Sequence, residues 1–203
     1  MKSFYRATIA LVFGMFVATA AAQDLDSVVE TCNGCHGDDG VSQWADMPTI
    51  AGMPEFVHAD ALFIYRDRAR PCAESKFRQG DTSRAPMSMC DVVADLDDAM
   101  LEDLAAYYFE LPFVAAKQDF DAALAEAGKA VHDSQCEKCH SDAGTNPDDE
   151  AGILGGQWMG YMEKSFAEYA SGKREQPAQM KEKMDALSAD DVKALLNFYA
   201  SQQ

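Results

Sequence analysis

The sequence has little positive charge and few long apolar runs. It contains 17 lysine and arginine residues against 34 aspartate and glutamate residues, and its net charge is −17. An acidic chain repels the phosphates of nucleic acids, so nucleic-acid binding is disfavoured. After residue 22 no uninterrupted apolar run approaches the roughly 18 residues that mark a membrane-spanning helix. The sequence therefore excludes a protein with several membrane spans.

The first 22 residues differ from the rest of the chain. Lys2 and Arg6 precede an almost wholly apolar run over residues 7–19, and three alanines ending at Ala22 supply small residues before Gln23. This pattern is typical of a secretory signal peptide, and its apolar run is too short for a comfortable membrane span. We expect cleavage near Ala22 and a periplasmic mature chain without a membrane span.

The sequence also lacks the signs of a nucleotide-binding sheet. No segment alternates polar and apolar residues as strands do, and no GxGxxG motif follows a strand. Any flavin used with this chain must therefore belong to a partner. With 48% hydrophobic residues the composition is globular, yet small domains usually need a covalent or metal staple to support their cores.

Two CxxCH motifs provide that staple. They are Cys32-Asn33-Gly34-Cys35-His36 and Cys136-Glu137-Lys138-Cys139-His140. Cysteines one helical turn apart face the same way and can form thioethers with both vinyl groups of one haem, while the adjacent histidine ligates the iron. The sequence thus predicts two covalently bound haem c groups, attached through Cys32, Cys35, Cys136 and Cys139, with His36 and His140 as axial ligands.

The cysteines of these motifs have three alternative uses: a redox dithiol, a disulfide and a zinc site assembled from both motifs. A thioredoxin-like dithiol requires a βαβ context, which the surrounding sequence does not provide. A zinc site built from four cysteines would leave two adjacent histidines without a purpose. Haem attachment accounts for all six residues of the two patterns.

The second half of the chain repeats the first. A shift of 104 residues aligns the two haem motifs and continues through the segment that follows them. A shift of 91 residues aligns the remainder, so the first half contains a 13-residue insertion. The aligned pairs include Cys32 with Cys136, Gly52 with Gly156, Tyr65 with Tyr169, Met89 with Met180 and Tyr108 with Tyr199.

Apolar stripes at helical spacing predict the secondary structure of each half. They fall over residues 57–65 and 101–108 in the first half, and over 120–131, 161–169 and 192–199 in the second. Ser188 and Asp191 form a capping pair before the last helix. We expect an all-α fold of two tandem domains, 23–114 and 115–203, each ordered as helix, haem motif, loop, helix, loop with methionine, and helix.

Met89 and Met180 are the predicted sixth ligands of the two irons, because they occupy equivalent positions in the repeat. A methionine thioether opposite histidine favours reduced iron and raises its potential. Met87 and Met184 lie close to them and compete for the same role. Each predicted ligand stands seven residues before the leucine that opens the final helix of its half.

Four further residues bear on iron ligation. His58 and His132 are alternative sixth ligands, but neither has a histidine as its repeat partner, which favours a surface or structural role. The backbone carbonyl of Pro48 stands where it can accept the Nδ1 proton of His36 and fix the ring, and Gly152 is its counterpart in the second half.

The residues quoted above resemble the diheme class I c-type cytochromes, and among them the cytochrome subunit of flavocytochrome c sulfide dehydrogenase. The likeness is strongest from Lys117 to Gln203, through Phe120–Leu124, the second haem motif, Leu154–Trp158 and Phe198–Gln203. It implies an electron-transfer subunit, not an enzyme by itself. An FAD-containing flavoprotein would be the donor, and a soluble cytochrome or an oxidase the acceptor.

Two other functions stay open from the sequence. The first is a free-standing electron shuttle to a terminal oxidase. The second is a haem enzyme acting on a sulfur compound, which needs an open or labile position on one iron. Cys90, directly after Met89, keeps the second alternative open, because a thiolate ligand would lower the potential and suit sulfur chemistry.

The inserted region of the first half departs from the resemblance. Cys72 lies within it, and in an oxidising compartment we expect Cys72 and Cys90 to form a disulfide that clamps the loop, with a Cys90 ligand or a reactive thiol as the alternative. The same region holds all the basic residues of the first half. They either pair with carboxylates or propionates nearby, or form a surface that docks a partner or guides an anion. These residues are Arg66, Arg68, Arg70, Lys76, Arg78 and Arg84.

Overall fold

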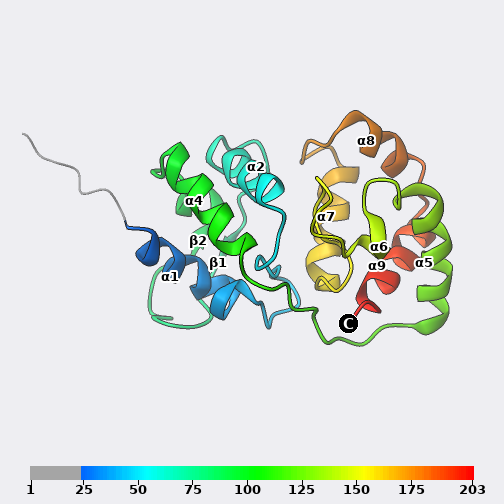
Figure 1. The fold of residues 1–203 in the computed structure, drawn as a ribbon, viewed down its shortest axis with the longest axis horizontal. Coiled ribbons are helices and arrows are strands. Elements are labelled where there is room, and N and C mark those ends of the chain that lie inside the picture. The colour runs from blue at the N-terminus through cyan, green and yellow to red at the C-terminus, as the bar shows by residue number, and fades with distance from the viewer. Residues whose placement is uncertain (1–23) are drawn as a thin grey trace, which may run out of the picture.

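The computed structural model describes residues 24–203, and the predicted signal peptide lies outside them. The chain forms two lobes of helices, joined by a connection that runs from Phe109 to Ala122 along one side of the molecule (Figure 1). The predicted domain boundary after Val114 falls within this connection. No helix within residues 24–203 is long and apolar enough to cross a membrane.

The first lobe contains four α-helices and a small two-stranded ribbon. The helices are α1 (Leu25–His36), α2 (Glu55–Arg66), α3 (Met89–Val92) and α4 (Asp98–Phe109), with a 3₁₀ turn η1 (Asp38–Gly40) after α1. The strands β1 (Glu74–Ser75) and β2 (Met87–Ser88) pair antiparallel and close the base of the inserted loop. Asp24 and Asp97 cap α1 and α4 by accepting backbone N–H groups of the first turn.

The second lobe contains five α-helices. They are α5 (Ala122–Gln135), α6 (Ser141–Gly144), α7 (Met159–Ala170), α8 (Ala178–Asp185) and α9 (Ala189–Ala200). Ser188 and Asp191 form the expected capping box at the start of α9. Gly128 lets α5 approach α9 closely, because a side chain there would collide with the carbonyl of Ala194. The predicted all-α architecture is therefore confirmed.

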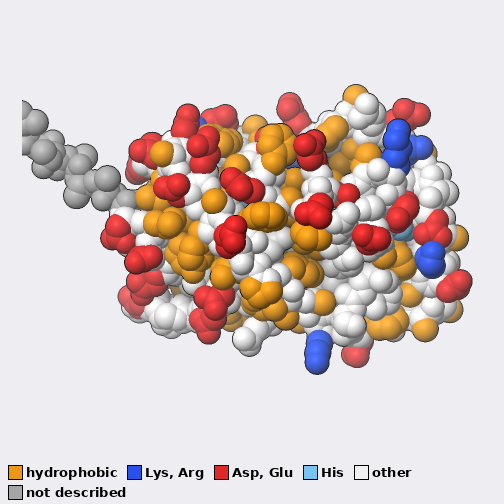
Figure 2. All heavy atoms as spheres, viewed as in Figure 1, with side chains coloured by type: hydrophobic (Ala, Val, Ile, Leu, Met, Phe, Trp, Pro, Cys, Tyr) orange, Lys and Arg blue, Asp and Glu red, His pale blue; other side chains and the backbone are white. Residues whose placement is uncertain are grey.

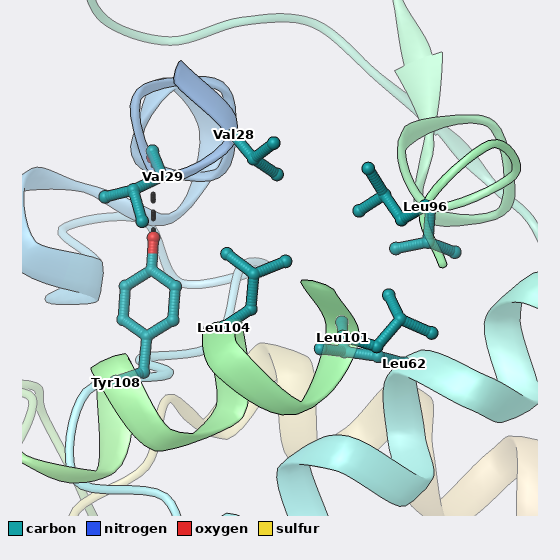
Figure 3. Packing of buried hydrophobic residues seen from close by; sticks show 8 residues of the cluster. Val28, Val29, Leu62, Leu96, Leu101, Leu104 and Tyr108 are labelled. Atoms are coloured by element: carbon teal, nitrogen blue, oxygen red, sulfur yellow. Dashed lines mark hydrogen bonds between the residues drawn. The ribbon is translucent and has the colours of Figure 1, made fainter. Parts of the chain in front are cut away.

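The core of the first lobe lies between α1, α2 and α4. Its buried apolar side chains surround Tyr108, whose hydroxyl donates to the carbonyl of Val29 and to the side chain of Asn33 (Figure 3). A second cluster in the other lobe surrounds Tyr199 in the same manner. Both tyrosines are 1% exposed, which places the repeated aromatic residue at the centre of each core.

The repeat extends to the backbone hydrogen bonds. The carbonyl of Gly40 accepts the N–H groups of the two residues before Gly52, and the carbonyl of Gly144 does the same before Gly156. Gly52 then donates to Tyr108 at 2.7 Å, and Gly156 donates to Tyr199 at 2.8 Å. Equivalent residues thus close equivalent loops in both lobes, as the aligned sequences predict.

The two predicted methionine loops differ from expectation. Met89 is the first residue of α3, and Met180 lies within α8. Apolar stripes at helical spacing do not indicate these two helices, because α3 has only four residues and α8 buries none of its side chains. In α8 an ion pair between Lys181 and Asp185, one turn apart, supports the helix instead.

The two lobes are fastened together by a buried amide. The side chain of Gln157 accepts the N–H of Thr49 at 3.0 Å and donates to the carbonyl of Thr49 at 2.9 Å. Both residues are 1% exposed. The indole N–H of Trp158 also donates to the carbonyl of Ser42 at 2.9 Å. These bonds satisfy backbone groups of one lobe with side chains of the other, so they fix the relative position of the lobes.

Candidate haem sites

The first motif occupies the end of α1. Cys32 and Cys35 lie on its last turn, and His36 is its final residue. Because α1 ends at Gly37, which has a φ of 89°, the chain turns away directly after the histidine. Helix geometry therefore presents both thiols and the imidazole from one short segment, as thioether attachment requires.

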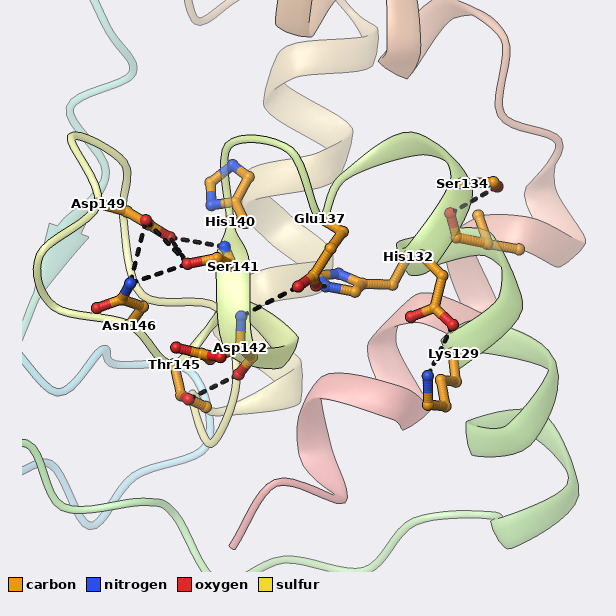
Figure 4. A network of polar contacts seen from close by, with 12 residues as sticks. Lys129, His132, Ser134, Glu137, His140, Ser141, Asp142, Thr145, Asn146 and Asp149 are labelled. Carbon is orange, nitrogen blue, oxygen red and sulfur yellow. Dashed lines mark hydrogen bonds and ion pairs between the residues drawn. The ribbon is translucent and has the colours of Figure 1, made fainter.

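The second motif starts where α5 ends. Cys136 is the C-cap of α5, Cys139 follows in a turn, and His140 precedes α6. Glu137, inside the motif, accepts the backbone N–H of Asp142 at 3.3 Å (Figure 4). Ser141, directly after the motif, is also fixed, because it donates both its N–H and its hydroxyl to the carboxylate of Asp149. Polar contacts thus hold this motif where the first has a helix.

The histidine of each motif bonds a backbone carbonyl, and the distance is the same in both lobes. The Nδ1 of His36 lies 3.0 Å from the carbonyl oxygen of Pro48, and the Nδ1 of His140 lies 3.0 Å from that of Gly152. Since a carbonyl can only accept, Nδ1 carries the proton and Nε2 keeps its lone pair. This confirms the hydrogen bonds predicted from Pro48 and Gly152, and it leaves Nε2 as the metal-binding nitrogen.

The electrostatics of the sites keep these groups neutral. Burial lowers the pKa of both His36 and His140, so each imidazole is uncharged and able to ligate a metal at neutral pH. Burial also raises the pKa of the Cys32 thiol to about 11, which keeps it protonated until it reacts. The four motif cysteines are free of disulfides in the described chain. The residues present therefore fit a covalently held haem in each lobe.

The zinc alternative does not agree with the structure. Within residues 24–203, no three or more His, Cys, Asp or Glu side chains gather where they could hold a metal ion. Each CxxCH motif lies in its own lobe, so the four cysteines do not form one tetrahedral set.

The two other histidines are both buried. His132 is fully buried, and both of its ring nitrogens have partners: Nδ1 lies 3.0 Å from the hydroxyl of Tyr199, and Nε2 lies 2.6 Å from the carboxylate of Glu137. No nitrogen of His132 is left for iron. His58 is 6% exposed, and burial lowers its pKa to about 4, so a surface location for either histidine is wrong.

The predicted sixth ligands occupy different surroundings. Met89 is half-buried, begins α3 and packs against the core of the first lobe. Met180 is half-buried on α8. Their assignment as iron ligands, and their preference over Met87 and Met184, remains a prediction.

Cys72 and Cys90 are joined by a disulfide in the structure. Cys90 is fully buried, directly after Met89. A sulfur bonded to another sulfur is not a thiolate, so Cys90 in this form is not available as an iron ligand or a reactive thiol.

The basic residues of the inserted region are mostly engaged within the chain. Arg78 forms two hydrogen bonds with Asp46 at 2.6 and 2.7 Å, and Arg66 pairs with Asp98 at 2.7 Å. Arg84 stacks on Phe77, with 4.0 Å from its guanidinium carbon to the ring centre. The first of the two expected roles, pairing with nearby groups, therefore describes these residues better than a free docking surface. Figure 2 shows that, among the charged side chains on the visible face, acidic ones are spread over both lobes and basic ones are few.

Arg70 belongs to a buried cluster between the lobes. Its guanidinium lies 4.1 Å above the ring centre of Tyr65 and 4.0 Å from the carboxylate of Glu168 in the second lobe. Arg174 stacks on Tyr169 in the equivalent position of the repeat, at 4.4 Å. No local pattern in the sequence indicates that one arginine of the basic segment is buried at the interface.

Comparisons with known proteins agree with this geometry. No family model matches the chain. A cytochrome c4 from Stutzerimonas stutzeri is 28% identical over 198 residues, which cover 91% of this chain and 90% of that protein. A cytochrome c4 from Azotobacter vinelandii is 28% identical over 70% of this chain and 69% of its own length.

Solved structures show the same likeness. The crystal structure of reduced recombinant cytochrome c4 from Pseudomonas stutzeri superposes with a TM-score of 0.68, at 25% identity, over 90% of this chain and 100% of that one. The chain is similar to the cytochromes c4. Its fold is two tandem class I cytochrome c domains, and it carries two covalently bound haem c groups.

A second solved structure shares the fold alone. Thiosulfate dehydrogenase (TsdBA) from Marichromatium purpuratum matches with a TM-score of 0.65 and 22% identity, over 85% of this chain and 36% of that one. None of these relatives is named as a subunit of flavocytochrome c sulfide dehydrogenase, so the resemblance to that protein in particular is a proposal. The likeness to diheme class I c-type cytochromes is the part that these relatives support.

Proposed function

We propose that this chain is an exported electron relay that accepts single electrons from one redox protein and passes them to another. One observation carries the proposal: each lobe presents a CxxCH motif whose histidine is held through Nδ1 by a backbone carbonyl at 3.0 Å. When bound, haem iron cycles between its ferrous and ferric forms and so supplies one-electron chemistry. Export to the periplasm agrees with the signal peptide expected over residues 1–22.

In this proposal the chain's own residues orient and tune the two sites. Pro48 and Gly152 fix the tautomer and plane of His36 and His140, which makes each a better ligand through Nε2. Met89 and Met180 would hold the two irons through their thioether sulfurs, which favour the reduced form. An iron held by both a histidine and a methionine would have no position free for a substrate, so electron transfer suits these sites better than substrate oxidation.

The lobe interface keeps the two sites in one geometry. Gln157 bonds both backbone groups of Thr49, and the N–H of Tyr161 in the second lobe donates to the carbonyl of Ala45 in the first at 2.9 Å. A relay benefits from this rigidity because the two haem sites then keep one relative position and do not have to approach each other before each electron transfer.

The proposed donor is a flavoprotein of the sulfide dehydrogenase kind. The support is the sequence resemblance from Lys117 to Gln203, together with the absence from the sequence of any dinucleotide-binding motif. The acceptor would be a soluble cytochrome or an oxidase.

A free-standing shuttle is the second candidate, and the match to cytochrome c4 over 91% of the chain is equally compatible with it. Co-purification separates the two. The chain is tagged in its native host, isolated from the periplasmic fraction and analysed for flavin by fluorescence after acid extraction. Flavin in a fixed ratio to haem supports the flavoprotein relay, whereas a flavin-free cytochrome that is rapidly oxidised by membranes supports the shuttle. Absence of haem from the tagged protein would refute both.

A further inference from the structure

The two haem-attachment motifs differ in what covers them. In the first lobe, the segment that connects β1 to β2 passes alongside α1 (Figure 1), and its backbone bonds directly to the motif. The N–H groups of Arg78 and Gln79 donate to the carbonyl of Gly34 at 2.8 and 3.2 Å. The carbonyl oxygen of Lys76 lies 3.7 Å from the sulfur of Cys35. The inserted loop therefore lies on the edge of the motif through which the haem is attached.

Phe77 is the centre of this cover. It is 5% exposed, and its ring rests on Gly34, the second of the two residues between the motif cysteines. A Cβ atom on Gly34 would lie 2.6 Å from the ring, closer than such atoms approach each other. The cover thus depends on glycine at this position, and the guanidinium of Arg84 stacks on the Phe77 ring.

Several contacts fasten the loop in place. The Cys72–Cys90 disulfide and the pairing of β1 with β2 close its base. Along its length, Arg78 bonds both carboxylate oxygens of Asp46, and the Gln79 amide donates to Asp38 at 2.7 Å. A loop closed at its base and bonded at its middle is a fixed part of the fold.

Within residues 24–203, no such cover lies on the second motif. Lys138 takes the position of Gly34 in the repeat, and both Lys138 and Cys139 are exposed. A lysine side chain at this position would collide with a ring seated as Phe77 is. The 13-residue insertion that supplies the cover is also confined to the first half of the sequence.

We propose that the loop from Cys72 to Cys90 insulates the first haem-attachment edge and directs exchange with outside redox proteins to the second edge, around Lys138 and Cys139. This inference rests on the proposed relay function and specifies which haem-attachment edge exchanges electrons with outside proteins. Each exchange moves one electron and no atom: the outside donor is oxidised and one ferric iron is reduced. Electron transfer slows steeply as the two partners are held apart, so a fixed layer of protein is sufficient to bias the choice of edge.

The first test measures access without any electron transfer. A soluble nitroxide is added to the ferrous, diamagnetic holoprotein, and the broadening of the proton signals from the thioether substituents of each haem is compared. We expect strong broadening at the second motif and weak broadening at the first. In Phe77→Ala the first motif should become as broadened as the second, while Phe56→Ala, which alters a side chain that is 71% exposed, serves as the matched control.

Gly34→Ala provides an independent variant that leaves the whole loop sequence intact. It should displace the Phe77 ring and raise the broadening at the first motif, and Lys138 at the equivalent position shows that CxxCH tolerates a side chain there. Haem content and the denaturation midpoint confirm that each variant is folded. Equal broadening of the two motifs in the unaltered protein would refute the proposal that the loop covers the first motif. Unchanged broadening at the first motif in both folded variants would refute it as well.

The second test measures exchange with hexaammineruthenium(II) by stopped-flow absorbance. We expect Phe77→Ala and Gly34→Ala to raise the second-order rate constant for reduction of the first haem several-fold, with Phe56→Ala unchanged. Unchanged rates in both variants would refute the directing role while leaving the relay intact. Failure of either haem to be reduced in any variant would instead refute the proposed function.

Discussion

The two lobes repeat each other in their helices and hydrogen bonds, but they differ around the haem motif. In the first lobe the motif ends a helix, contains Gly34 and lies beneath an inserted, disulfide-closed loop. In the second, the motif follows a helix, contains an exposed Lys138 and is held by Glu137 and Asp149. The shared parts position the ligands of an iron, whereas the differing parts control what reaches each motif from outside.

The interior partners of the repeated tyrosines differ in the same way. Tyr108 donates to Asn33 at 2.8 Å, while Tyr199 bonds His132, which in turn bonds Glu137. Asn33 and Glu137 are equivalent in the repeat. The first motif therefore contacts its core tyrosine directly through an amide, whereas the second motif contacts its core tyrosine through a carboxylate and an intervening imidazole. The second motif thus contains an acidic side chain at the position where the first contains a neutral amide.

The largest expected effect comes from removing one attachment. Replacing Cys32 and Cys35 with serine should yield a chain that carries a single haem, because the second lobe has its own motif, core and caps. Intact-mass spectrometry and pyridine haemochrome absorbance check the haem number. Cys136→Ser with Cys139→Ser is the matched control and should give the converse species. Loss of both haems in either variant would show that the lobes do not mature independently.

The disulfide gives the next largest effect, and it is confined to one lobe. Replacing Cys72 and Cys90 with alanine opens a loop with a sequence separation of 18 residues. By loop-closure entropy this should lower the free energy of unfolding of the first lobe by about 3 kcal/mol. Guanidinium unfolding followed at haem signals assigned to each lobe provides the measurement. An equal loss in both lobes, or none, would contradict the assignment of the loop to the first lobe alone.

The lobe interface should be sensitive to a single amide. Gln157→Leu leaves the buried N–H and C=O groups of Thr49 without their partners, which we expect to cost about 2 kcal/mol. The two lobes should then unfold in separate transitions in differential scanning calorimetry. Gln179→Leu alters an exposed glutamine on α8 and is the control. A single unshifted transition for Gln157→Leu would show that other contacts join the lobes.

The smallest effect concerns the two capping boxes, which are alike in both lobes. Ser88 opens α3 and Ser188 opens α9, and replacing either with alanine should cost about 1 kcal/mol. Hydrogen bonds from these serines lower the pKa of Asp91 and Asp191 below their ordinary value. A lowered pKa in the folded state means stability that is present above the ordinary pKa and lost as pH falls through the folded value. Denaturation midpoints should therefore show the cost at neutral pH and a smaller one in strong acid, and a cost independent of pH would contradict the pairing.

Much of this fold follows from local sequence patterns. CxxCH spacing and the 104-residue repeat identify the two haem domains, since both depend on residue type at fixed separations. Helical stripes locate α2, α4, α5, α7 and α9, and Ser188 with Asp191 marks where α9 begins. The hydrogen bonds of the two motif histidines could also be anticipated, because the distance from His36 to Pro48 recurs in the repeat.

The features missed by sequence reasoning depend on contacts between distant segments. Phe77 lies in a loop without periodicity, and only the fold shows that it rests on Gly34, 43 positions earlier. Gln157 and Arg70 likewise reveal their roles at an interface that no local pattern encodes. The glycine between two motif cysteines was a signal that could have been used, since its counterpart is a lysine.

Near-infrared magnetic circular dichroism of the oxidised holoprotein tests the central claim most directly. The account predicts two haems of His/Met ligation, with half of the Met-to-iron charge-transfer intensity lost in Met89→Ala and the other half in Met180→Ala. Full retention of that intensity in Met89→Ala and Met180→Ala, or a spectrum with a bis-histidine or thiolate-ligated haem in the unaltered protein, would contradict it.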